Sequence, residues 1–314
     1  MTTSTTGRAH AVEEHWTVVD GTETRYLEAG RGSPVVLLHG EGGVAEQWHD
    51  VLQGLAAGHH RAIAVDLPGY GYTKPIPDSS PAALAAFVHA FTRTLRLERH
   101  ALVGHSLGGG VAVTAALQRP DRLSALVLVS PSGMGRAINP AMVVQSVTPL
   151  GDLTVRLIPV LPFGPKALVG GTALIGARRP WRMSALWWSS QVQAVATPGS
   201  LTTSLNSTRA SVGPLGQRNL ALGRLPELSM PTLVAWGLGD LMVPFWQGIA
   251  ARRRLRRGRL RLFPGAGHLL PVEAPEALLG AVLPFLAGAA TPGTAVDVAA
   301  GGDDTGPLVG GGRS

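Results

Sequence analysis

The stretch Leu102-Val103-Gly104-His105-Ser106-Leu107-Gly108-Gly109-Gly110 decides the fold of this chain. The apolar run 101–103 predicts a short buried strand, and the segment 107–119 is compatible with a helix. Between them lies the pattern G-x-S-x-G, from Gly104 to Gly108. A serine at so sharp a turn has a strained backbone, so the residues two before and two after it must lack side-chain bulk. The turn lifts the Ser106 hydroxyl out of the sheet and points the free N–H groups of the helix N-terminus toward any oxygen that becomes negative.

Composition indicates a globular protein with an ample core. The 314 residues, 45% of them hydrophobic and 15% charged, suit one large domain with an inserted subdomain, or two small domains. Residues 1–10 are polar and predict no signal peptide, and the lack of an uninterrupted apolar run of about 20 residues predicts no membrane span. The absence of cysteine excludes disulfides and thiolate metal sites. We therefore expect a cytoplasmic protein.

The net charge of +7 is unevenly spread, because residues 252–261 hold seven arginines. A patch for nucleic acid or for a membrane surface is one interpretation. A solvated helix face followed by an edge strand is the favoured one, since no aromatic residue interleaves the arginines and no nucleic-acid motif accompanies them. We expect no nucleic-acid partner.

The order of the elements predicts an α/β fold. A hairpin with its turn at Asp20-Gly21 is followed by apolar strands that alternate with helical segments, at 34–38, 62–65, 101–103, 123–129, 232–236 and 259–263. Such continuous apolar strands predict a mostly parallel sheet with helices on both faces. Helical spacing without a strand-like run predicts an inserted helical lid over 134–225. The core then comprises 13–133 and 226–288, with a disordered leader at 1–12 and a disordered Gly-rich tail at 289–314.

Two later loops supply partners for Ser106, which is a weak nucleophile without a general base. Asp240 follows the strand at 232–236, and His268 follows the strand at 259–263. In a parallel sheet the residues just past the strand ends converge on one edge, where sites form. Ser106, Asp240 and His268 are therefore expected to meet.

The order Ser…Asp…His at strand ends resembles the α/β-hydrolase superfamily, over about residues 13–288. The resemblance implies an eight-stranded, mostly parallel sheet with an inserted helical lid. It extends to several flanking motifs, namely His39-Gly40, Asp66-x-x-Gly69-x-Gly71, Asp240-x-x-Val243-Pro244 and His268-x-x-x-x-Glu273-x-Pro275.

By this resemblance Ser106 attacks an acyl carbon, His268 takes its proton, and Asp240 orients the imidazole. The backbone N–H groups of Glu41 and Leu107 are expected to hold the oxyanion. The resemblance implies neither a metal ion nor an organic cofactor.

The lid's apolar helices and tryptophans indicate either a pocket for a hydrophobic small molecule or only the lid's own core. The expected lining residues of such a pocket are Gly40, His105, Trp181, Trp187 and Leu269, although His105, like His39, is better explained by loop packing, and Asp66 by pinning a loop.

Glu41 departs from the family pattern, because a carboxylate beside an oxyanion hole opposes negative charge unless it is protonated or turned away. We expect its side chain near the mouth of the pocket, where it would repel anionic substrates. A catalytic or substrate-orienting role and a solvent-turned side chain are the alternatives.

Several reactions fit these residues. Cleavage of a carboxylic ester, lactone or thioester is the main interpretation. Haloalkane dehalogenases and epoxide hydrolases of this fold use an aspartate in place of Ser106, and C–C bond hydrolases typically have a tryptophan where this chain has Leu269. A C–C hydrolase, a biosynthetic cyclase or acyltransferase, and a binding protein with a vestigial triad remain as alternatives.

Overall fold

A single eight-stranded sheet organises the computed structural model, which describes residues 10–290. The strand order is β1-β2-β4-β3-β5-β6-β9-β10; β1 and β2 are antiparallel to their neighbours and the remaining pairs are parallel. This confirms the predicted fold class. The strands are β1 (Glu13–Val19), β2 (Thr22–Ala29), β3 (Ser33–Leu38), β4 (His60–Val65), β5 (His100–His105), β6 (Leu123–Val129), β9 (Thr232–Gly237) and β10 (Gly258–Phe263).

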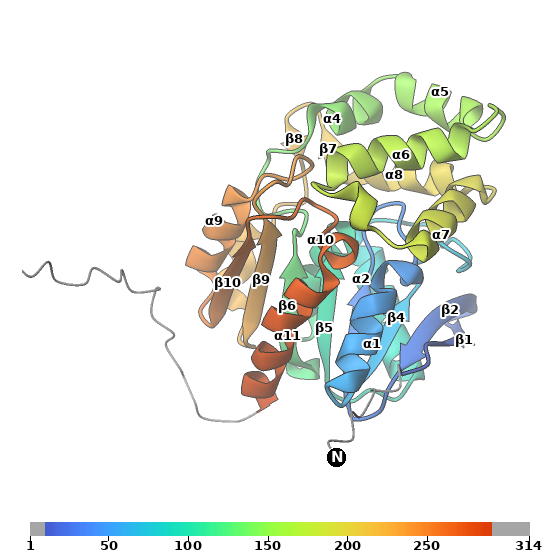
Figure 1. Ribbon diagram of the computed structural model, residues 1–314. Helices are drawn as coiled ribbons and strands as arrows, with labels where there is room; N and C mark the ends of the chain where they lie inside the picture. The colour runs from blue at the N-terminus through green and yellow to red at the C-terminus, as the bar shows by residue number, and fades with distance from the viewer. Residues whose placement is uncertain (1–9, 291–314) are drawn as a thin grey trace, which may run out of the picture.

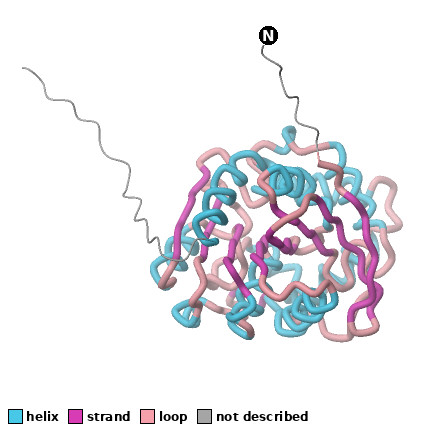
Figure 2. Tube along the Cα trace, turned by 90° about the horizontal axis from the view of Figure 1, so that it is seen from below, coloured by secondary structure: helices cyan, strands magenta, loops and turns pink. Residues whose placement is uncertain are grey.

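Helices cover both faces of the sheet, as Figures 1 and 2 show. One face buries a cluster formed with α2 (Pro81–Thr94), α3 (Leu107–Gln118) and α9 (Trp246–Arg254). The other face packs against α1 (His49–Ala57) and α11 (Pro275–Ala290). The central strands are buried on both sides, which is why their sequences are apolar without alternation.

A helical insertion separates β6 from β9. It contains α4 (Pro140–Val147), α5 (Leu150–Leu157), α6 (Gly164–Gly176), α7 (Ala185–Ala196) and α8 (Ser200–Ser211), and Figure 1 shows them above the carboxyl ends of the strands. A two-stranded hairpin, β7 (Val212–Gly213) with β8 (Gly216–Gln217), interrupts the segment where no strand was expected. Strands of two residues are too short to leave a periodic pattern. A separate apolar cluster joins α6 and α7 to Leu269 and Val272 of the core.

The boundaries of the core differ slightly from those expected. Val12 was assigned to the leader but packs against the core, and α11 continues to Ala290, past the expected start of the tail. Residues 1–9 of the predicted leader and 291–314 of the predicted tail lie outside the described residues. Within residues 10–290, every helix is too short or too polar to cross a membrane.

Candidate active site

Ser106 sits on a strained turn between β5 and α3. Its backbone angles are φ 52° and ψ −117°, a region that residues other than glycine rarely adopt. A Cβ at Gly104 would collide with the carbonyl of Gly108, and a Cβ at Gly108 would collide with the carbonyl of His39. The steric reason for the G-x-S-x-G spacing is therefore visible in the contacts themselves.

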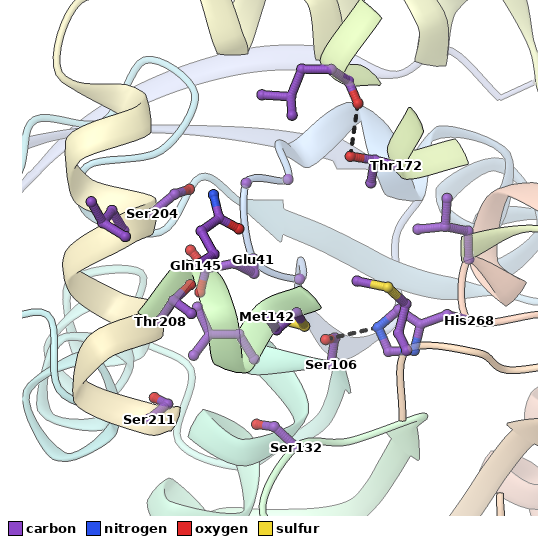
Figure 3. Close-up of a pocket in the computed structure, with 18 of the residues that line it drawn as sticks. Glu41, Ser106, Ser132, Met142, Gln145, Thr172, Ser204, Thr208, Ser211 and His268 are labelled. Carbon is purple, nitrogen blue, oxygen red and sulfur yellow. Dashed lines mark hydrogen bonds between the residues drawn. The ribbon is translucent and has the colours of Figure 1, made fainter. Parts of the chain in front are cut away.

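A continuous chain of hydrogen bonds joins Ser106, His268 and Asp240. Ser106 Oγ lies 2.9 Å from His268 Nε2, and His268 Nδ1 lies 2.8 Å from Asp240 Oδ2 (Figure 3 shows the first of these contacts). Because a carboxylate can only accept, Nδ1 carries the proton and Nε2 is free to accept one from the serine hydroxyl. The three residues come from the ends of three different strands.

The Asp240 carboxylate is held in a fixed orientation. Its Oδ1 accepts from the backbone N–H of Met242 (2.9 Å) and Val243 (2.8 Å), and its Oδ2 also accepts from the Trp236 indole (3.1 Å). The pKa of Asp240 is lowered. Burial by itself would raise it, but the charge and hydrogen bond of His268 and the two backbone donors outweigh that effect. The carboxyl is therefore ionised when it faces His268.

His105 supports the loop that carries His268. Its Nε2 donates to the His268 carbonyl at 2.9 Å, which leaves Nδ1 to accept from Gln47 Nε2 at 3.0 Å. Burial and the neighbouring His268 lower the pKa of His105 to about 3, so it is a neutral ring. Gln47 Oε1 in turn accepts from the N–H of Gly40 at 3.4 Å.

The Glu273 carboxylate, which is buried, joins the His268 loop to the insertion. One oxygen accepts from the N–H of Gly267 (2.7 Å) and the other from the N–H of Arg179 (2.6 Å). The N–H of Leu269 also donates to the Gly176 carbonyl at 3.0 Å. The end of α6 is thus fastened to the loop that holds the candidate base.

The N–H groups of Glu41 and Leu107 have no hydrogen-bond acceptor among the described residues. Both residues line the same cavity as Ser106. Leu107 is the first residue of α3, where backbone N–H groups lack intrahelical partners. Gly40 allows its loop to lie close to Ser106, since a Cβ at this position would contact His105 Nδ1 at 2.8 Å and Ser106 Cβ at 3.2 Å.

Glu41 lines the cavity and is half-buried, with its carboxyl beside Ser204 and Ser207 of α8, so the alternative of a side chain turned to solvent is wrong. Tyr70 Oη donates to Glu41 Oε1 at 2.8 Å. Burial raises the pKa of Glu41 to about 7, and the hydrogen bond from Tyr70 and the neighbouring hydroxyl groups of Ser204 and Ser207 limit the rise. The carboxyl is therefore half-ionised near neutrality and does not carry the fixed charge that the sequence alone suggested.

A cavity of about 230 Å³ opens above Ser106. Its apolar wall includes Trp187 and Leu269, as expected, together with Met142, Val155, Leu168, Val169 and Val195. Trp181 lies elsewhere, with 78% of its side chain exposed, which corrects that expectation. Both tryptophans belong to the same apolar segment, and only tertiary packing decides which of them faces the cavity.

A polar stripe on α8 forms the other wall. Ser204, Thr208 and Ser211 recur at helical spacing and face the cavity, with Gln145 nearby (Figure 3). None of the described residues that line the cavity is a lysine or an arginine. Among residues 10–290 there is also no cluster of three or more His, Cys, Asp or Glu side chains suited to a metal ion.

His39 and Asp66 hold the surrounding loops in place. His39 Nε2 accepts from the N–H of Leu67 at 2.9 Å. The buried Asp66 accepts from the N–H of Ala45 (2.7 Å) and from the Arg25 guanidinium (3.1 Å). Their place in loop packing agrees with the interpretation of the sequence.

The sequence interpretation did not include Tyr70, Ser204, Ser207, Gln47 or the role of Glu273. The Ser204, Thr208 and Ser211 spacing was a usable signal, because a helix with hydroxyls on one face is unusual in an apolar insertion. The partners of Glu41 left no such signal, since they come from two distant segments.

A parallel sheet with a serine on a strand-to-helix turn, hydrogen-bonded through histidine to aspartate, defines a class of hydrolytic enzymes. Residues 33–156 match the family model described as the alpha/beta hydrolase fold, and the chain belongs to this family.

The chain is similar in sequence to several curated proteins. An uncharacterized protein of Mycobacterium tuberculosis is 32% identical over 279 residues, covering 85% of this chain and 79% of the relative. The dihydrolipoyllysine-residue acetyltransferase component of the acetoin cleaving system of Cupriavidus necator is 31% identical over 81% of this chain, which spans only 64% of that protein. A 2-hydroxy-6-oxononadienedioate/2-hydroxy-6-oxononatrienedioate hydrolase of Comamonas testosteroni is 28% identical, covering 83% and 90% of the two chains.

Among solved structures, a serine hydrolase involved in carbazole degradation superposes with a TM-score of 0.73 at 24% identity, covering 88% of this chain and 99% of the other. At this identity the superposition supports the fold alone.

Proposed function

We propose that this hydrolase cleaves a carboxylic ester, lactone or thioester of an uncharged, hydrophobic substrate through an acyl-enzyme on Ser106. The observation that carries the proposal is the hydrogen-bonded chain from Ser106 through His268 to Asp240, open to a cavity on the serine side. Such an arrangement activates a hydroxyl for attack on an acyl carbon.

In the first half of the reaction, Ser106 Oγ bonds to the acyl carbon while its proton passes to His268 Nε2. The carbonyl π electrons move to the oxygen, and the N–H groups of Glu41 and Leu107 hold the oxyanion; a donor of this kind contributes roughly 3–4 kcal/mol to transition-state stabilisation. Collapse of the intermediate expels the alcohol or thiol, which takes the proton from Nε2. Water then repeats the sequence on the acyl-enzyme and releases the acid.

The cavity wall supports a neutral substrate. Apolar side chains and hydroxyl groups line it, the one acidic side chain is Glu41, and no lysine or arginine faces it among the described residues. An anionic substrate would find no counter-ion there, and burial of an unpaired charge is unfavourable. This weighs against a substrate of the dienedioate kind named for the Comamonas relative.

Labelling with a fluorophosphonate tests the proposal. We expect mass spectrometry to find the adduct on Ser106, and esters, lactones and thioesters of graded acyl length to be hydrolysed with the longer neutral acyl groups preferred. The Asp240→Asn variant, which cannot hold the imidazole in the same tautomer, is expected to lose both label and turnover. Rapid cleavage of a vinylogous 1,5-diketone acid, with no turnover of any ester, would contradict the proposal in favour of a C–C bond hydrolase.

A further inference from the structure

An exposed apolar surface covers the outer side of the helical insertion. It spans residues 144–163, which include the end of α4, all of α5 and the loop that leads to α6; we call this segment the roof segment. Isolated exposed apolar side chains are common, but a continuous run of them marks an interaction site. Eight large side chains of the segment are each at least 41% exposed, namely Val144, Val147, Leu150, Leu153, Leu157, Val160, Leu161 and Phe163.

Helix α5 presents its leucines to solvent. Leu150, Leu153 and Leu157 share one face and are exposed, while Gly151 is buried against α8 and Val155 lines the cavity. An amphipathic helix normally turns its apolar face to the core. Since Gly151 is the buried residue of α5, core packing does not account for these leucines.

The loop after α5 carries the most exposed side chains. Its sequence is Pro159-Val160-Leu161-Pro162-Phe163, and all five residues are exposed. Phe163, 76% exposed, has φ 61°, a left-handed conformation that is strained for an aromatic residue. The two prolines restrict the loop and lower the entropy lost when it binds a partner. The loop is held with its apolar side chains outward.

Two cations lie on or next to this surface. Arg156 on α5 and Lys166 in the first turn of α6 are exposed and form no ion pair within the described part of the chain, and Lys166 Nζ lies 5.9 Å from the centroid of the Phe163 ring. The one acidic residue of the range 140–186, Asp152, is paired with Arg209 at 2.6 Å.

Apolar and aromatic side chains flanked by free cations fit an anionic lipid surface, where the side chains enter the interface and the cations meet the headgroups. A second copy of the same surface would bring like charges together.

We propose that the roof segment docks the protein on the surface of an anionic phospholipid membrane, with the loop 159–163 and the leucines of α5 entering the interface. Because α5 also lines the cavity through Thr154 and Val155, docking places the cavity beside a reservoir of apolar molecules. The inference concerns attachment and does not depend on the reaction at Ser106.

Co-sedimentation of the full chain with vesicles tests the proposal. We expect binding to vesicles that contain phosphatidylglycerol and at least tenfold weaker binding to pure phosphatidylcholine. The triple variant Val160→Ser/Leu161→Ser/Phe163→Ser, and separately Arg156→Gln/Lys166→Gln, should each weaken binding at least tenfold. Two matched controls should bind as the wild type does: Val18→Ser/Leu215→Ser, which removes comparably exposed apolar side chains, and Arg252→Gln/Arg253→Gln, which removes charge from α9.

The triple variant should hydrolyse a soluble short-chain ester at the wild-type rate, because none of its three residues lines the cavity. Unchanged vesicle binding by the triple variant, or equal losses in the controls, would overturn the proposal. So would a dimer of the wild type in sedimentation velocity that the triple variant converts to a monomer, since the partner would then be a second copy. Sedimentation of Ser106→Ala, expected to match the wild type, separates this result from any failure of the proposed reaction.

Discussion

Tyr70 Oη donates a 2.8 Å hydrogen bond to Glu41 Oε1, so the loop after β4 supports the side chain of the residue whose N–H is the proposed oxyanion donor. The pair lies where α8 closes over both loops; a Cβ at Gly69 would strike Thr203 of that helix. Burial raises the pKa of Glu41 to about 7. Charge beside the candidate oxyanion site therefore depends on pH near neutrality.

The first prediction concerns anionic substrates. Below pH 7 Glu41 is mostly protonated, and above pH 7 it is mostly ionised and repels negative charge, by about 4 kcal/mol at most for a 4 Å separation at an effective dielectric of 20. We expect the ratio of kcat/KM for a hemisuccinate ester to that for a neutral ester of equal length to fall at least tenfold between pH 6 and pH 8. In Glu41→Gln this ratio should stay constant over the same interval. A ratio that changes equally in both proteins would show that Glu41 is not responsible.

The variant Tyr70→Phe should shift the pH at which the substrate ratio falls. The hydrogen bond from Tyr70 lowers the pKa of Glu41 against the effect of burial, so its removal should raise the pKa further. The fall in the substrate ratio should then occur at higher pH than in the wild type, and the Glu41→Gln/Tyr70→Phe double variant should again show none. A transition at unchanged pH would mean that the phenol does not act on this carboxyl.

Replacement of the nucleophile gives the third prediction. Ser106→Ala should lower turnover by about a millionfold, as loss of a triad nucleophile does, with an unchanged melting temperature because the alanine fits the same turn. Ser132→Ala, which also removes a hydroxyl from the cavity wall, should retain turnover within a few-fold. Full esterase activity of Ser106→Ala would refute the assignment.

His100 offers a stability test away from the site. It is buried at the start of β5 with Nδ1 unpartnered, and burial lowers its pKa to about 4. Between about pH 6.5 and pH 4 the unfolded chain binds a proton that the folded chain does not, so the free energy of unfolding falls as pH falls through this window, by about 3 kcal/mol for this group. His100→Leu should reduce that fall and raise stability at pH 5, as measured by urea denaturation at pH 5 and pH 7. An identical decrease in the variant would argue against the buried imidazole as a cause.

The arginine run is expected to be a solvated surface. All seven arginines of residues 252–261 are exposed, on α9, on β10 and in the turn between them. Arg252→Gln/Arg253→Gln/Arg256→Gln should leave hydrolysis of a small neutral ester unchanged. Salt-sensitive DNA binding by the wild type at physiological ionic strength, lost in the variant, would contradict this expectation.

The sheet and the Ser106 turn were predictable because local sequence determines them. Gly104 is required by a contact with Gly108 four residues along, and Gly108 by contacts with Leu38 and His39 at the end of the neighbouring strand β3. The motif that carries both glycines is nevertheless local, and the apolar strands are recognisable without knowledge of their neighbours. Asp240 and His268 could be predicted because parallel strands end at a common edge of the sheet. Residues that directly follow such strands in the sequence therefore lie close together in the structure.

The surroundings of Glu41 were not predictable in the same way. Its hydrogen-bond partner Tyr70 and its neighbours Ser204 and Ser207 come together only when α8 packs on the core, and no sequence pattern links segments so far apart. The same limit explains Trp181, whose exposure depends on how the segment between α6 and α7 turns over the core.

The hydrogen bonds of Glu273 fasten one part of the insertion to the loop that carries His268. Hydrogen bonds join the end of α6 and Arg179 to the loop that carries His268. A displacement of the end of α6 would therefore pull His268 away from Ser106. Helix α5 packs on α4 and α8, and Asn139 at the start of α4 is hydrogen-bonded to the carbonyls of Leu241 and Met242 in the loop that carries Asp240. Movement of α5 alone would therefore leave Ser106 and His268 aligned, whereas movement of the end of α6 would carry the His268 loop with it.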